Sequence, residues 1–295
     1  MDIRKNNNLY LLTKSPLWAI DPRIMPHLLS QLAVGFIPTW EATKPYALGK
    51  GPNKVAVIPV EGVLTKDGPA WLGSNYNGIA SALESVAADA TVKRVVLSVD
   101  SPGGEVTGLP ETGALVAQVA KAKPVSAMVE GLSASAAYWL TSQASDITLT
   151  PSGEVGSVGV RMMHMDISEM MKQMGISVTE LHAGNYKTEW SPFHPLTDEA
   201  KADMQTRINA VHEDFLTAVK AGRGVRASQE MAEQRFGEGR MMSAPQAEAH
   251  GMVDRLQASR DFYKAIMPAL EIEDQPQQHG IPARRARLEV ERKRF

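Results

Sequence analysis

Two closely spaced serines are the side chains best placed to do covalent chemistry. Ser133 and Ser135 lie in Gly131-Leu-Ser-Ala-Ser-Ala-Ala-Tyr-Trp139, which follows an expected strand and opens an expected helix. The free N–H groups of a first helical turn favour negative charge there, and the small alanines leave room for a substrate backbone. Serine is also a common helix cap, so this segment alone predicts either a cap or a nucleophile.

A pair of glycines follows another expected strand, in Asp100-Ser-Pro-Gly-Gly104. Glycine lets the backbone approach a ligand closely and turn its N–H groups outward. Such amides can stabilise the oxyanion that develops when a carbonyl is attacked. An ordinary strand-to-helix turn has the same composition, so this motif by itself leaves both interpretations open.

Lys187 ends the segment Gly184-Asn-Tyr-Lys187. A lysine is normally a solvated surface charge. It acts as a general base near neutral pH only when its surroundings favour the neutral amine, as burial among apolar groups does. Three aromatic residues nearby could supply such surroundings: Tyr186, Trp190 and Phe193.

Two histidines near this lysine leave a second mechanism open. His182 or His194 could serve a Ser–His triad in place of a Ser–Lys dyad. The seven histidines include no His-x-x-x-His pair, which argues against a zinc site. The absence of cysteine excludes disulfides and thiolate chemistry. We expect the reaction to need no cofactor and no metal.

The composition fits one sizeable core and argues against two classes of partner. The chain has 295 residues, 43% of them hydrophobic, and a formal net charge of -2. It has no basic excess that would make nucleic acid the main partner. The first fifty residues hold no apolar run long enough to span a bilayer, so we expect a protein that is neither secreted nor membrane-anchored.

Short apolar runs alternate with helical patterns and predict an α/β fold. We expect strands over 55–60, 94–99, 125–129 and 146–149, and helices over 78–88, 108–122 and 134–144. This alternation is typical of a mainly parallel sheet covered by helices. Further along we expect a helix over 167–174, a strand over 177–181, a long helix from Thr197 to Gly222 or Gly224, and helices over 228–235 and 244–250.

The chain divides into three parts by composition. Residues 1–53 are interrupted by prolines and predict an N-terminal arm and linker, residues 54–270 a catalytic domain, and residues 271–295 a flexible basic tail. The tail is either a solvated, self-repelling segment or a docking segment for an acidic protein surface.

The motifs together resemble the signal-peptide-peptidase A family of serine peptidases. The resemblance covers about residues 54–256 and includes Gly156-Ser-Val-Gly-Val160 besides the serine, glycine and lysine motifs. It implies a Clp/crotonase-like fold of stacked β-β-α units with a helical C-terminal part. It also implies Ser135 as nucleophile and Lys187 as general base. The implied oxyanion donors are the amides of Gly103 or Gly104 and of Ala136.

The sequence resembles one branch of this family more than the others. Asn75-Tyr-Asn-Gly-Ile79 and 156–164 resemble segments of the phage capsid-assembly proteases. That resemblance implies a homo-oligomer that cleaves scaffold, portal or other capsid proteins, in the host cytoplasm or inside the immature head. It leaves open whether Lys187 acts within its own chain or on another copy. One departure is Ser135-Ala-Ala-Tyr138, where the family usually has Ser-Gly-Gly-Tyr; alanine is still small, so we expect the dyad to be kept.

Three alternatives to a capsid-maturation protease stay open at this point. The chain could be a signal-peptide-peptidase-like enzyme that degrades peptides. It could be a crotonase-like acyl-CoA enzyme, which would need no Ser–Lys pair. It could also be a catalytically idle assembly protein that keeps the fold as a scaffold.

Overall fold

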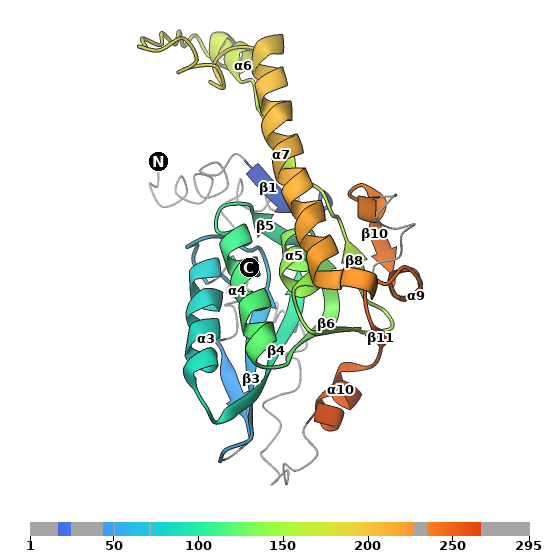
Figure 1. Cartoon of the computed structure of the whole chain (residues 1–295). Helices are drawn as coiled ribbons and strands as arrows, with labels where there is room; N and C mark the ends of the chain where they lie inside the picture. Colours follow the sequence, from blue (N-terminus) through green and yellow to red (C-terminus); the bar gives the residue numbers. More distant parts are fainter. Residues whose placement is uncertain (1–16, 25–43, 50, 71, 227–234, 267–295) are drawn as a thin grey trace, which may run out of the picture.

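The structure is a computed structural model that describes residues 17–24, 44–49, 51–70, 72–226 and 235–266 (Figure 1). Four parallel strands form its centre: β3 (Lys54–Glu61), β4 (Val92–Ser101), β6 (Val125–Ala134) and β7 (Asp146–Leu149). The buried residues of these strands are mostly valine, isoleucine, leucine and alanine. Such continuous apolar runs are typical of parallel strands covered on both faces.

Helices cover both faces of this sheet. Figure 1 shows α3 (Tyr76–Ala88), α4 (Leu109–Ala122), α5 (Ala136–Ser142) and α7 (Asp198–Arg223) gathered on one side. On the other face, Phe262 of α10 (Ser259–Ile266) packs in a second apolar cluster with residues of β3, β4 and β6. The expected α/β class is confirmed, and β4, β5 (Gly103–Glu105) and α4 form a β-β-α unit.

Short elements complete the fold. They are β1 (Leu17–Ile20), β2 (Tyr46–Leu48), β8 (Glu154–Gly156), β9 (Arg161–Met162), α6 (Ser168–Gln173), η1 (Gly224–Arg226), η2 (Arg235–Gly237), β10 (Met241–Ser243), α9 (Ala244–Ala249) and β11 (Arg255–Leu256). The large sheet has the order β10-β8-β6-β4-β3-β2, with β7 beside β6 and β11 beside β7. A separate three-stranded sheet has the order β5-β1-β9. No helix of the described residues combines the length and apolar content that a membrane crossing needs.

The long helix begins and ends where the sequence predicts. The side chain of Thr197 accepts a hydrogen bond from the amide of Ala200 (3.2 Å) and caps the N-terminus. Gly224 ends the helix with a positive φ of 53°. The C-terminal half of α7 packs on α5 through Trp139 and Phe215, whose ring centroids are 4.9 Å apart. The N-terminal half extends beyond the sheet (Figure 1).

Two features differ from the expectations. The strand predicted over 177–181 is wrong: this segment is irregular and exposed, and no described strand pairs with it. Residues 17–20, expected in the N-terminal arm, form β1 between β5 and β9. Most of the helix predicted over 228–235, together with the tail over 271–295, lies outside the described residues. The division into arm, catalytic domain and tail stays a prediction.

A buried ion pair joins the end of α7 to the C-terminal part of the chain. The guanidinium of Arg223 is fully buried and donates to both carboxylate oxygens of Asp254, at 2.8 and 3.1 Å. The same carboxylate accepts from the amide of Ile147 in β7 (2.7 Å). Burial raises the pKa of Asp254, but the hydrogen bond and charge of Arg223 outweigh it, so this pKa is lowered overall.

We predict that Asp254→Asn destabilises the fold by about 3 kcal/mol, because it leaves the buried Arg223 charge unpaired. A carboxyl whose pKa is lowered by folding stabilises the protein above its unfolded pKa of about 3.9, and this contribution is lost as the pH falls through the folded pKa. Urea unfolding at pH 7 and in steps down to pH 3 measures both effects. The variant should be less stable at pH 7 and lose less stability on acidification; exposed Asp261→Asn is the control. Equal stability of Asp254→Asn and the unmodified chain at pH 7 would contradict this role.

Candidate active site

Ser135 stands at a sharp turn between β6 and α5. Its φ of 53° and ψ of -119° are unusual for a residue with a side chain. Such backbone strain persists only where the surrounding structure enforces it, and it is concentrated at functional sites. The Ser135 amide donates to the carbonyl of Gly156 (2.8 Å), and its hydroxyl donates to the carbonyl of Gly159 (3.3 Å). The motif Gly156–Val160 therefore holds both the backbone and the side chain of this serine.

The glycine pair lies directly against the residue that follows Ser135. A Cβ placed on Gly103 would come within 3.0 Å of the Ala136 amide nitrogen and 2.9 Å of the Ala134 carbonyl oxygen. Gly103 also has a φ of +94°, which side chains disfavour. A Cβ on Gly104 would collide with the Leu64 carbonyl oxygen. The structure thus brings together Ser135, Ala136, Gly103 and Gly104, and only glycine fits at the last two positions.

Ser133, the other serine of the motif, makes a structural contact. Ser133 is fully buried in β6, and its hydroxyl shares a hydrogen bond of 2.9 Å with the hydroxyl of Thr141 on α5. This contact ties the strand to the helix that follows the turn. Of the two serines, only Ser135 stands at the strained turn beside the glycine pair.

Lys187 is not brought to this turn within one chain. Its side chain is exposed, and its neighbour Tyr186 interacts with Glu199 in the first turn of α7; the charge of Glu199 and a hydrogen bond to it raise the pKa of Tyr186. The other end of the helix, around Phe215, packs on α5. From position 199 to position 215 the helix rises about 24 Å. Figure 1 accordingly shows the segment around α6 beside the end of α7 that is remote from α5.

The two candidate histidines lie in the same segment as Lys187. His182 contacts the carbonyl of Gly184 (3.0 Å), and His194 lies 3.7 Å from the carboxylate of Glu180. Both contacts are within the segment that accompanies the N-terminal end of α7. Neither a Ser–His pair nor a Ser–Lys pair is therefore assembled from these residues within a single chain. Among the described residues, no group of three or more His, Asp or Glu side chains is arranged to hold a metal ion.

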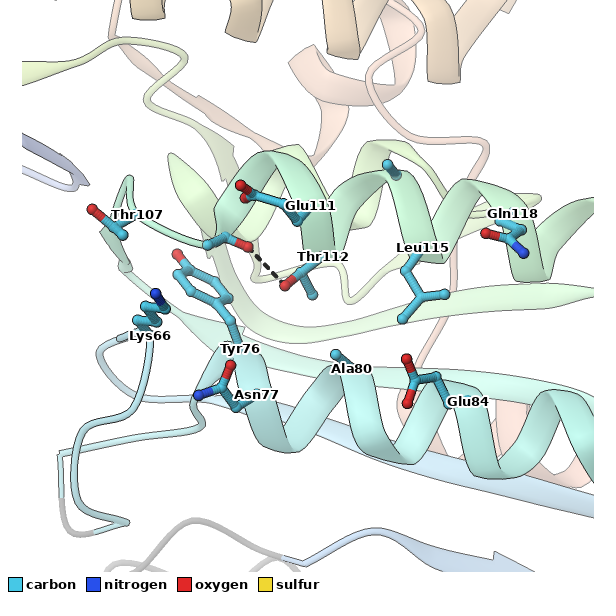
Figure 2. A pocket seen from close by; sticks show the side chains of 12 residues that line it. Lys66, Tyr76, Asn77, Ala80, Glu84, Thr107, Glu111, Thr112, Leu115 and Gln118 are labelled. Atoms are coloured by element: carbon cyan, nitrogen blue, oxygen red, sulfur yellow. Dashed lines mark hydrogen bonds between the residues drawn. The ribbon is translucent and has the colours of Figure 1, made fainter.

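A separate pocket lies between α3 and α4 (Figure 2). Its lining includes Lys66, Tyr76, Glu84 and Glu111, and beside them Thr112 donates to the carbonyl of Gly108 (2.8 Å). None of its lining residues belongs to the group around Ser135. No catalytic or binding motif indicated this pocket, because its polar residues are scattered over α3, α4 and the segments that precede them.

Comparison with known proteins assigns the chain to a family. The sequence model of peptidase family S49 matches residues 117–273, which is more than half of the chain. The chain belongs to peptidase family S49. The matched region includes both Ser135 and Lys187. The resemblance inferred from the motifs is thereby confirmed at the level of the family.

Three curated relatives show how the family S49 match extends over the chain. "Putative protease MJ0651" of Methanocaldococcus jannaschii is 38% identical over 62% of this chain and 58% of its own length. "Capsid assembly protease C" of Escherichia phage lambda is 30% identical over 74% of this chain and 50% of its own length. "Head-tail preconnector protein GP5" of Enterobacteria phage P21 is 33% identical over 57% of this chain. The chain spans 58, 50 and 34% of the lengths of these relatives.

Solved structures give weaker likenesses to this S49 chain. A mutant of the "1510-N membrane-bound stomatin-specific protease", in complex with a substrate peptide, is 14% identical, with a TM-score of 0.47 over 76% of this chain and 83% of its own. An enoyl-CoA hydratase/isomerase family member is 15% identical, with a TM-score of 0.46 over 78% of this chain and 75% of its own.

Proposed function

We propose that this chain is a serine endopeptidase in which Ser135 attacks the peptide bond and Lys187 of a second copy is the general base. The observation that carries the proposal is the turn at Ser135: a strained serine, the following amide of Ala136, and the glycine pair lie together in a chain of a peptidase family. The hydrogen bond between Ser133 and Thr141 supports a structural role for Ser133 instead.

In the proposed reaction, the Ser135 hydroxyl oxygen bonds to the carbonyl carbon of the substrate while its proton passes to the Lys187 amine. The amides of Ala136 and of Gly103 or Gly104 donate to the resulting oxyanion. The C–N bond then breaks, and the leaving amine takes the proton from Lys187. Water attacks the acyl-enzyme in the same way and releases Ser135. Each step conserves protons and needs no cofactor.

The placement of Lys187 supports a base supplied in trans. The segment around it carries exposed apolar side chains that a soluble monomer rarely gathers: Met163, Met165, Met170, Met174, Ile176, Val178, Leu181 and Tyr186. Exposed apolar patches of this kind mark protein–protein contacts. Lys187 lies in the same segment. A second copy packed on these residues would remove them from water and could bring its own Ser135 turn to the lysine.

We further propose that the natural substrates are head proteins of a phage, such as scaffold, portal or capsid proteins. The two phage relatives support this proposal, and they share 30% and 33% identity with the chain. A general peptide-degrading protease is the second candidate, because the archaeal relative has the higher identity at 38%.

Co-expression of this chain with phage head proteins separates these two candidates. Mass spectrometry of the products should show defined fragments of one head protein that depend on Ser135. If casein is cleaved while every head protein stays intact, the chain is a general protease and the capsid role is wrong.

A further inference from the structure

The strand β1 lies in the gap between two elements of the candidate active site. It pairs antiparallel with β5, which carries the glycine pair, and antiparallel with β9, which directly follows the Gly156–Val160 motif. In this register Ala19 faces Gly104 and Ile20 faces Gly103. The Val106 amide donates to the Leu17 carbonyl (3.3 Å), and the Asp21 amide donates to the Pro102 carbonyl (2.8 Å).

The carbonyl oxygen of Ala19 lies beside the candidate oxyanion donors. A Cβ on Gly103 would collide with the Ala19 carbonyl oxygen and would come 3.0 Å from the Ala136 amide nitrogen. Both atoms therefore border the same side of Gly103. Ala136 is the residue after Ser135, so a carbonyl of β1 lies close to the candidate oxyanion donors.

An extended peptide can bind to a protein as an added strand, because its amides and carbonyls then pair with an exposed sheet edge. The edges of β5 and β9 flank the Ser135 turn, and β1 occupies both. The side chain of Ser135 is fully buried, as are Ala19 and Ile20. No second peptide can pair with β5 at this place while β1 is there.

We propose that Leu17–Ile20 is an internal pseudosubstrate, which fills the peptide-binding cleft and must leave before another peptide binds. This inference rests on the proposed function of the Ser135 site. Besides its backbone pairing, an exposed ion pair fastens the segment that follows the strand to β8. Within this segment, the buried carboxylate of Asp21 pairs with Arg23 (2.7 Å). Arg23 in turn pairs with Glu154 of β8 (3.0 Å), through side chains that are 55% and 41% exposed. The Arg23–Glu154 pair is therefore weak and is screened by salt.

A reversible lock tests whether β1 blocks the cleft. Trp18 and Arg161 are register partners on β1 and β9, and the chain has no cysteine of its own. Trp18→Cys with Arg161→Cys should therefore form one disulfide when oxidised. The pair is made in a Ser135→Ala background, so that no cleavage interferes. The probe is a fluorescein-labelled synthetic peptide of residues 13–24, whose binding is measured by fluorescence anisotropy.

We expect the oxidised pair to bind this peptide at least about tenfold more weakly than the reduced pair. Each single cysteine variant should be insensitive to oxidation. Arg23→Ala, which removes the surface fastening, should bind the peptide several-fold more tightly than the Ser135→Ala parent. Equal binding by the oxidised and reduced pairs would overturn the inference, as would failure of the disulfide to form.

The same pair with Ser135 intact separates this inference from the proposed function. Casein cleavage should fall on oxidation and return on reduction. If neither state cleaves casein while peptide binding still follows the lock, the proposed peptidase function fails and the pseudosubstrate stands. If peptide binding ignores the lock, the pseudosubstrate fails whatever the cleavage assay shows.

Discussion

Replacing Ser135 with alanine should abolish peptide cleavage and leave the fold intact. The change removes one oxygen, whose hydrogen bond within the described part of the chain is the 3.3 Å contact with the Gly159 carbonyl. Loss of a catalytic serine nucleophile costs about 10⁴-fold or more in kcat. The measurement is kcat/KM on fluorescently labelled casein, together with covalent labelling by a fluorophosphonate probe.

Ser133→Ala is the matched control for this prediction. It removes a buried hydrogen bond to Thr141 and should lower stability by about 1 kcal/mol, while most of the activity remains. If Ser133→Ala is inactive and Ser135→Ala is active, the nucleophile has been assigned to the wrong serine. If both variants keep full activity, the turn is not the catalytic site.

Lys187→Ala and Lys187→Arg should both be inactive, again by several orders of magnitude, because neither side chain can accept the serine proton. Arginine keeps the positive charge but stays protonated at every accessible pH. The casein assay measures the loss, and thermal unfolding should show an unchanged fold, since the Lys187 side chain is exposed.

Two further outcomes would contradict the assignment of Lys187 as the general base. Full activity of Lys187→Arg would eliminate the dyad. Loss of activity on His182→Ala or His194→Ala alone, with Lys187→Ala active, would favour the Ser–His alternative. Lys201→Ala, at an exposed position on α7, controls for a general effect of removing a positive charge from this part of the molecule.

The central sheet and its helices could be predicted from the sequence because their signals are local. The apolar runs of β3, β4, β6 and β7 and the cap at Thr197 each lie within a few residues. The predicted strand over 177–181 failed because its apolar residues find no neighbouring strand among the described residues. A strand is stable only with a partner, and partners are not visible in a local pattern.

The strand β1 escaped prediction for the related reason that its partners are distant. Its four residues, Leu17–Ile20, pair with strands about 85 and 145 positions further along the chain. A four-residue apolar run between Pro16 and Pro22 was the one available sign. For the site, the family resemblance implied that Ser135, Ala136 and the glycine pair act together. These residues lie close to one another in the structure, and their catalytic roles stay a prediction. The distance of Lys187 from them depends on which end of α7 its segment accompanies, which no motif encodes.

Mixing two inactive variants tests the shared active site most directly. Ser135→Ala keeps the lysine and Lys187→Ala keeps the serine, so an assembly containing both can pair an intact serine with an intact lysine across an interface. Each variant alone should be inactive on casein. After the two are dissociated, mixed in equal amounts and reassembled, up to roughly one quarter of the unmodified activity should return, since about that fraction of the active sites combines an intact serine with an intact lysine. A mixed assembly that stays inactive, with both variants shown to be present in it, would contradict a lysine supplied by a second copy.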